Sequence, residues 1–167
     1  MKFRLATQND LPQIKAVYRD IIDRMDESGI QIWDDVYPCE FFADDIKRGR
    51  LYVLMDGGKV AAAFALCESN SGADAVEWND TGATALYLDR LGVSVEYARQ
   101  GVGIAMLHHA CDLARKRGAT YLRLFVVDGN EPALNLYRKN GFEQVGTYDE
   151  VIDADLVLRE WGFEKRL

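Results

Sequence analysis

Two glycines stand between a predicted strand and a long predicted helix, in the run Glu96-Tyr97-Ala98-Arg99-Gln100-Gly101-Val102-Gly103. Gly101 and Gly103 lack a Cβ, so the main chain there can turn its N–H groups toward a ligand without steric obstruction. The helix that follows would direct its unpaired N–H groups and the positive end of its dipole to the same place. The run therefore predicts an anion site that suits a pyrophosphate.

Three interpretations of this glycine pair compete. A P-loop requires GxxxxGK[ST], a string that the chain does not contain. A dinucleotide fingerprint requires a third glycine at the position of Met106, and it would come earlier in the chain. The third interpretation is a glycine-tolerant loop that enters a buried helix. A lone GxG favours the third, so other parts of the chain have to decide.

The elements around the loop are predicted from periodicity. Apolar residues recur at intervals of three and four over residues 9–25, which predicts a helix begun by Thr7, Asp10 and Pro12. Two apolar runs, 51–55 and 60–68, flank a turn typical of a hairpin, Asp56-Gly57-Gly58-Lys59. Other strands are expected at 2–6, 84–95, 121–127, 142–148 and within 156–165, and other helices at 41–48, 101–117 and 131–140. Early hairpins and one strand–helix–strand crossover predict a mixed α/β fold with helices over a mixed sheet.

Composition narrows the classes of function. The 167 residues predict a single domain, 1–167, and the net charge of −7 argues against a general nucleic-acid binder. Cys39, Cys67 and Cys111 lie far apart without metal-ligand spacing, so neither a disulfide framework nor a metal site is predicted. The N-terminus lacks the apolar segment of a signal peptide, and no apolar run approaches a membrane span. We therefore expect a cytoplasmic protein.

Two stretches together are more specific than either alone: LGVSVEYARQGVGIAML at residues 91–107 and GNEPALNLYRKNGF at residues 129–142. In this combination the chain resembles the GNAT superfamily of acetyl-CoA-dependent N-acetyltransferases. The resemblance is strongest over residues 87–142 and looser over residues 2–66. It implies a central mixed, splayed β-sheet of about six to seven strands flanked by about four helices.

The resemblance also implies which residues contact acetyl-CoA. Its pantetheine arm would pair with the exposed backbone of the splayed strand, here at Leu91, Gly92 and Val93. Its pyrophosphate would bind backbone amides of the loop, here at Arg99, Gln100, Gly101, Val102, Gly103 and Ile104. The family pattern [Q/R]-x-x-G-x-[G/A] has Ala98 at its first position, so the side-chain contact of that position is absent unless Arg99 replaces it.

The second stretch supplies the remaining cofactor contacts, at Asn130, Ala133 and Tyr137. An Asn at position 130 equally suits the N-cap of the helix that follows, and the two roles are compatible. Tyr137 matches the family's general acid, which protonates the departing thiolate; the alternative is a half-buried aromatic side chain.

Acetyl transfer also needs an oxyanion donor and a base. The backbone N–H of Val93 is the matching donor for the tetrahedral oxyanion. Deprotonating an amine of pKa near 10.4 at pH 7 costs about 4–5 kcal/mol, so a base or a water chain is required. Tyr87 occupies the family's base position and is no carboxylate, which leaves Asp89, two residues on and acting through water, or Glu68. The alternative for Asp89 is a solvated carboxylate at a strand end.

The acceptor site is the least defined part. In the family it is built largely from the segment after the first helix, here residues 26–40, and from the loop after the hairpin. Trp33, Tyr37 and Tyr87 are the candidate substrate-binding residues, with Asp34, Asp35 or Glu40 as partners for a cation. Core packing is an equal alternative for Trp33.

The predicted function is an N-acetyltransferase that moves an acetyl group from acetyl-CoA to a primary amine by direct attack in a ternary complex. A small amine is expected before a peptide N-terminus or a lysine. The acidic surface could attract a cationic one, and solubility alone explains that charge equally well. The expected partners are this amine and, in a homodimer, a second copy of the chain, but no nucleic acid and no membrane. The alternative is a catalytically silent protein of the same fold that senses acyl-CoA.

Overall fold

The computed structural model describes residues 1–152 and 156–167. The chain forms two compact units. The first comprises Met1–Leu66 and Arg90–His109, and the second Cys67–Asp89 and Ala110–Leu167. The expectation of one domain stays a prediction.

The first unit contains the N-terminal half of the secondary structure. Its strands are β1 (Lys2–Leu5), β2 (Leu51–Asp56) and β3 (Lys59–Cys67), and its α-helices are α1 (Leu11–Glu27) and α2 (Phe42–Lys47). Short 3-10 turns precede these helices, η1 (Gln8–Asp10) and η2 (Cys39–Phe41). The last residues of β4 (Ala85–Val93), η4 (Val95–Tyr97) and the first half of α3 (Val102–Lys116) complete it.

Helix α1 forms where the apolar spacing predicted it. Thr7 and Asp10 make the expected capping box, and Pro12 lies in the first turn. The spacing of its buried side chains places them on one face of the helix. They are Ile14, Tyr18, Ile21 and Ile22. They place Tyr18 inside the core, where it matters for the site described below.

The predicted hairpin is confirmed. Strands β2 and β3 pair antiparallel down to Asp56↔Lys59, and both turn residues, Gly57 and Gly58, have positive φ. β1 pairs antiparallel with the other edge of β2, from Lys2↔Met55 to Leu5↔Tyr52. β3 is buried on both faces from Val60 onward, so its apolar side chains form the centre of the core together with their neighbours on β2.

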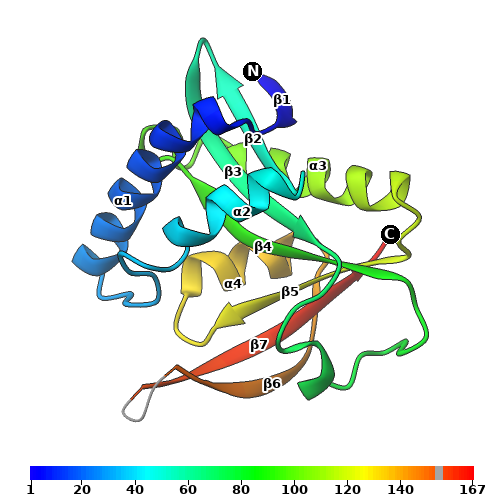
Figure 1. Ribbon diagram of the computed structural model, residues 1–167. Coiled ribbons are helices and arrows are strands. Elements are labelled where there is room, and N and C mark those ends of the chain that lie inside the picture. The colour runs from blue at the N-terminus through cyan, green and yellow to red at the C-terminus, as the bar shows by residue number, and fades with distance from the viewer. Residues whose placement is uncertain (153–155) are drawn as a thin grey trace. The chain divides into compact units, whose positions relative to one another are not determined.

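The second unit contains β5 (Tyr121–Val127), α4 (Glu131–Lys139), β6 (Glu143–Val151) and β7 (Val157–Arg166), with the start of β4, the end of α3 and the turn η3 (Ala73–Ala75). β7 pairs antiparallel with both β5 and β6, and Figure 1 shows β6 and β7 as two long strands side by side. β6 extends beyond the predicted residues 142–148 because its pairing with β7 continues to Val151↔Val157. Parallel pairing of β4 with β5 covers Ala85–Tyr87, although β5 continues to Val127.

The predicted fold class is confirmed. Within the described ranges the chain has seven strands in one mixed sheet, in the order β1-β2-β3-β4-β5-β7-β6, and four α-helices. β4 and β5 pair in parallel, as the strand–helix–strand crossover through α3 requires. The pairings of β2 with β1 and β3, and of β7 with β5 and β6, are antiparallel.

Candidate functional site

The predicted anion loop of the first unit runs from η4 into α3. Arg99 and Gly101 have φ values of 59° and 80°, so the main chain reverses direction just before the helix. Gly101 accepts the first helical hydrogen bond, from the N–H of Ala105 at 3.0 Å. The amides of residues 102–104 have no acceptor in the part of the chain that the structure describes. These are the donors that a helix N-terminus offers to an anion, so the loop fits a pyrophosphate.

The stretch 91–93 ends β4 in the same unit. Gly92 is buried, while Leu91 and Val93 are half-buried. A Cβ on Gly92 would lie 2.6 Å from the ring of Tyr18, so this position requires glycine for a close approach rather than for its φ. The binding roles predicted for the three residues stay predictions.

Trp33 and Tyr37 lie on the segment between α1 and α2. The Trp33 ring stacks on Tyr18 at 5.5 Å between centroids, and the Tyr37 ring meets Phe41 edge-on at 5.3 Å. Both are half-buried, so each presents part of its ring to solvent. Asp34 Oδ1 accepts the N–H groups of Val36 and Tyr37 and thus fixes the turn, so one oxygen of this candidate cation partner is already engaged.

Asn130 precedes α4 in the second unit. Its side-chain oxygen accepts the N–H of Ala133 at 3.3 Å, so the N-cap role is confirmed. The cofactor contact predicted for Asn130 and Ala133 stays a prediction.

Tyr137 lies on the inner face of α4. Its side chain is buried and its ring packs edge-on against Phe142 at 5.6 Å. Burial, and then the negative charge of Asp89, raise the pKa of the Tyr137 phenol well above its ordinary value. The phenol therefore keeps its proton throughout the neutral range, which a general acid requires.

Asp89 is half-buried on β4, and its Oδ1 accepts a hydrogen bond from Asn70 Nδ2 at 3.0 Å. A second carboxyl in this unit, Glu160 on β7, was not predicted. Burial, the nearby Glu150 and, to a smaller degree, Asp89 raise the pKa of Glu160 to about 8. The register places Glu160 opposite Tyr148 on β6. Glu160 meets Tyr148 and Glu150 only because β6 pairs with β7. No local pattern in the sequence could therefore reveal the raised pKa of Glu160.

Tyr87, the third candidate for substrate binding, is buried and meets Trp78 edge-on at 6.3 Å between centroids. Trp78 is itself fixed, since its Nε1 donates to the carbonyl of Ala73 at 2.8 Å. The surroundings of Tyr87 within the second unit are thus those of a packed side chain, and its role toward the acceptor stays a prediction.

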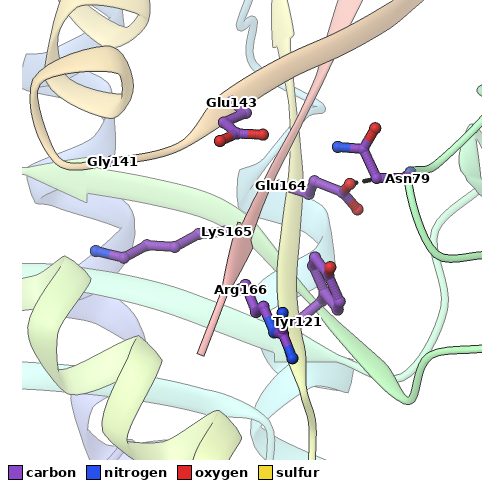
Figure 2. Close-up of a pocket in the computed structure, with 7 residues that line it drawn as sticks. All are labelled: Asn79, Tyr121, Gly141, Glu143, Glu164, Lys165 and Arg166. Carbon is purple, nitrogen blue, oxygen red and sulfur yellow. Dashed lines mark hydrogen bonds between the residues drawn. The ribbon is translucent and has the colours of Figure 1, made fainter.

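A cavity of about 340 Å³ in the second unit contains none of the predicted site residues. It is lined by Asn79, Tyr121, Gly141, Glu143, Glu164, Lys165 and Arg166. Figure 2 shows Glu164 and Lys165 pointing to opposite sides of β7, with Glu164 directed at the main chain of Asn79. Glu164 also pairs with buried Arg123 at 3.2 Å, and Lys165 Nζ donates to the carbonyl of Asn140. Because the charges of Glu164 and Lys165 are engaged in these contacts, the cavity is a poor candidate for the reaction.

Within residues 1–152 and 156–167, no group of three or more His, Cys, Asp or Glu side chains is arranged to hold a metal ion. The same residues include no helix with the length and apolar character needed to cross a membrane.

Comparison with known proteins identifies a family. The Acetyltransferase (GNAT) family profile matches residues 14–142. Streptothricin acetyltransferase of Streptomyces lavendulae is 36% identical over 69 residues, 41% of this chain and 34% of that protein. N-alpha-acetyltransferase 50 of Danio rerio is 29% identical over 124 residues, 71% of this chain and 69% of that protein. The match thus spans about a third of the first relative's length.

Solved structures share the fold over nearly the whole chain. A GNAT-family acetyltransferase from Streptococcus agalactiae superposes with a TM-score of 0.83 at 19% identity, covering 99% of this chain and 95% of that one. At this level of identity the likeness concerns the fold and not the substrate.

Proposed function

The chain belongs to the GNAT acetyltransferase family, and from this premise we propose that it moves the acetyl group of acetyl-CoA to a primary amine by direct attack in a ternary complex. The observation that carries the proposal is the family match over residues 14–142, which spans the anion loop, β4 and α4. Acetyl transfer is the family's activity, and acetyl-CoA is its cosubstrate. The mechanism and the acceptor are proposals for this chain.

Backbone amides of the loop hold the pyrophosphate in this proposal. The donors at residues 102–104 support it, because they lack an acceptor among the described residues and lie at the positive end of the α3 dipole. Ala98 provides no side-chain donor, and the exposed Arg99 beside it supplies a positive charge. Leu91, Gly92 and Val93 pair with the pantetheine arm, and the Val93 N–H stabilises the oxyanion.

Tyr137 protonates the departing thiolate, supported by the environment that keeps its phenol protonated. Asp89 accepts the ammonium proton of the acceptor through water. Glu160 is not the base in this proposal, because burial and the nearby Glu150 raise its pKa to about 8 and the carboxyl therefore already holds a proton at neutral pH. Asp89→Asn tests this role: if Asp89 is the base, its loss should lower kcat and remove the acid limb of the pH profile of kcat.

The proposed acceptor is a small amine, with a cationic one favoured by the net charge of −7. Trp33 and Tyr37 would contact it through the exposed parts of their rings. Relatives named for streptothricin and thialysine give precedent for small acceptors, while the relative named as an N-alpha-acetyltransferase gives precedent for a peptide N-terminus. A cytoplasmic location and a homodimer stay predictions.

The test is release of free CoA from acetyl-CoA over a panel of polyamines, aminoglycosides, amino acids and peptides with free N-termini. We expect turnover with at least one small amine and a mass increase of one acetyl group on it. Tight binding of acetyl-CoA without turnover on any amine would favour the acyl-CoA-sensing alternative. Binding of NADH but not of CoA would contradict the cofactor assignment.

A further inference from the structure

Arg90 has an unusual backbone conformation in the first unit, directly before the stretch 91–93. Its φ is 56°, the left-handed region that residues other than glycine rarely adopt, because their Cβ crowds the neighbouring carbonyl. Such a residue persists only where surrounding contacts hold it. Two sets of contacts do so here, one to its side chain and one to its main chain.

The side chain of Arg90 forms a buried, two-point ion pair. Its Nε and Nη2 lie 2.9 and 3.1 Å from the two carboxylate oxygens of Asp45 on α2. The Asp45 side chain is fully buried, and it also accepts a hydrogen bond from Arg50 Nε at 2.6 Å. Two guanidinium groups therefore neutralise and satisfy this carboxylate, which fixes Arg90 to α2.

The main chain on both sides of Leu91 is bound by one side chain, the hydroxyl of Tyr18 from α1. This hydroxyl lies 2.5 Å from the carbonyl oxygen of Arg90 and 3.0 Å from that of Ala63 on β3. It also accepts the N–H of Gly92. Tyr18 thus occupies a place in the hydrogen-bond ladder between β3 and β4 that a backbone group would otherwise take.

This insertion decides which way the peptide groups of β4 point. Backbone groups of successive residues in a strand alternate between its two edges. The carbonyl of Arg90 and the N–H of Gly92 both face Tyr18. On the same side of the strand, Ser94 donates its N–H to the carbonyl of Ala61. The backbone N–H and C=O groups of Leu91 and Val93 must therefore point to the opposite edge of β4. These are the residues to which the proposed function assigns the pantetheine and the oxyanion.

We propose that Tyr18 is a positioning residue for acetyl transfer. Its hydroxyl, with the Asp45–Arg90 ion pair, holds the bend at Arg90 so that the N–H of Val93 is aimed at the reacting thioester. The proposal rests on the proposed function, because it concerns the alignment of that reaction. Tyr18 itself touches neither substrate in this scheme.

The first test is Tyr18→Phe, which removes the hydroxyl and keeps the ring contacts with Trp33 and Phe42. Misalignment of the Val93 N–H should lower kcat by about tenfold or more and change the KM of the amine by less than about threefold. Tyr52→Phe is the matched control, since Tyr52 stacks on Phe3 in the same unit, and its kcat should stay within about twofold of wild type. Wild-type kcat in folded Tyr18→Phe would overturn the proposal.

A second pair of variants decides the matter if Tyr18→Phe does not fold. Arg90→Gly and Arg90→Ala both lose the ion pair, but only glycine adopts a φ of 56° without strain. We expect Arg90→Gly to keep a kcat at least about fivefold higher than Arg90→Ala, at matched folded fractions by circular dichroism. Equal kcat values would overturn the proposal. An inactive wild-type protein would instead overturn the proposed function, and this proposal with it.

Discussion

Tyr137 combines two properties at the scale of a single residue: a phenol that stays protonated and a buried position on α4. Both follow from its surroundings, because desolvation and the charge of Asp89 disfavour the phenolate. Phe142 and Phe163 support the ring. The residue can therefore lose its hydroxyl without losing its packing.

We expect Tyr137→Phe to lower kcat by about a hundredfold, because the thiolate then departs without a proton donor. Acetyl-CoA affinity, measured by isothermal titration calorimetry, should change by less than about threefold. Tyr121→Phe, in the same unit, is the control for loss of a phenol. Unchanged turnover of Tyr137→Phe would remove the acid assignment.

Gly92 lies so close to Tyr18 that the structure leaves no room for a Cβ at this position. In Gly92→Ala the new Cβ would meet the ring and hydroxyl of Tyr18 at 2.6–2.8 Å, too close for either to stay in place. We expect a loss of about 1–3 kcal/mol in the free energy of unfolding, measured by urea denaturation. Gly82→Ala is the control, since its nearest neighbour is Asp80 at an ordinary 3.6 Å. Equal stability of the two variants would contradict the close packing.

At the scale of elements, we expect the β6–β7 pair to make the free energy of unfolding depend on pH, through Glu160. It brings Glu160 near Glu150 and Tyr148, and burial is the largest cause of its raised pKa. The pKa is 4.5 in the unfolded chain and about 8 in the folded one. Between these values the folded state keeps a proton that the unfolded state has released, so this contribution is complete at low pH and is lost as the pH rises.

Between about pH 5 and pH 8, the free energy of unfolding of the wild type should therefore fall by about 1–3 kcal/mol more than that of Glu160→Gln, after allowance for partial exposure. Denaturant titrations at both pH values measure this difference. Glu143→Gln, an exposed position on β6, should keep the wild-type dependence. Identical slopes for wild type and Glu160→Gln would show that Glu160 is an ordinary carboxylate in the fold.

At the scale of the whole molecule, the cosubstrate should stabilise the folded chain by mass action. At a free concentration of about 100 times its Kd, acetyl-CoA should add about 2.7 kcal/mol. For a chain of this size that is a rise in Tm of about 5–10 °C in differential scanning fluorimetry. CoA should act similarly and NADH should have no effect. A shift with NADH and none with CoA would refute the proposed cosubstrate.

Much of the architecture could be predicted from local pattern. The helix expected at residues 9–25 is α1 at Leu11–Glu27, because its apolar spacing and capping box are both encoded within a few residues. The same holds for the hairpin of β2 and β3, where two glycines of positive φ make the turn. The end of β6 was predicted too early because its last residues are strand only by pairing with β7.

The anion loop was predicted from its two glycines together with the Asn130–Tyr137 stretch, and the structure adds the positive φ of Arg99 and Gly101 and the N-cap made by Asn130. The φ of Gly101 and the N-cap of Asn130 are local features that their residue types favour, whereas a positive φ at Arg99 is not what an arginine favours. The pKa of Glu160 and the bend at Arg90 are not local. The bend depends on partners 45 and 72 positions away in the chain, Asp45 and Tyr18.

The sequence by itself determined the family, the order of elements and the loop that suits a pyrophosphate, because each is encoded in residues close together along the chain. Only the tertiary structure decided that Tyr18 enters the ladder between β3 and β4, that Asp45 is buried beneath Arg90, and that Glu160 shares its surroundings with Glu150. The physical reason is that burial and charge pairing depend on which strands and helices meet. Periodicity along the chain predicts where each helix and strand lies, but it does not predict which elements pack against one another.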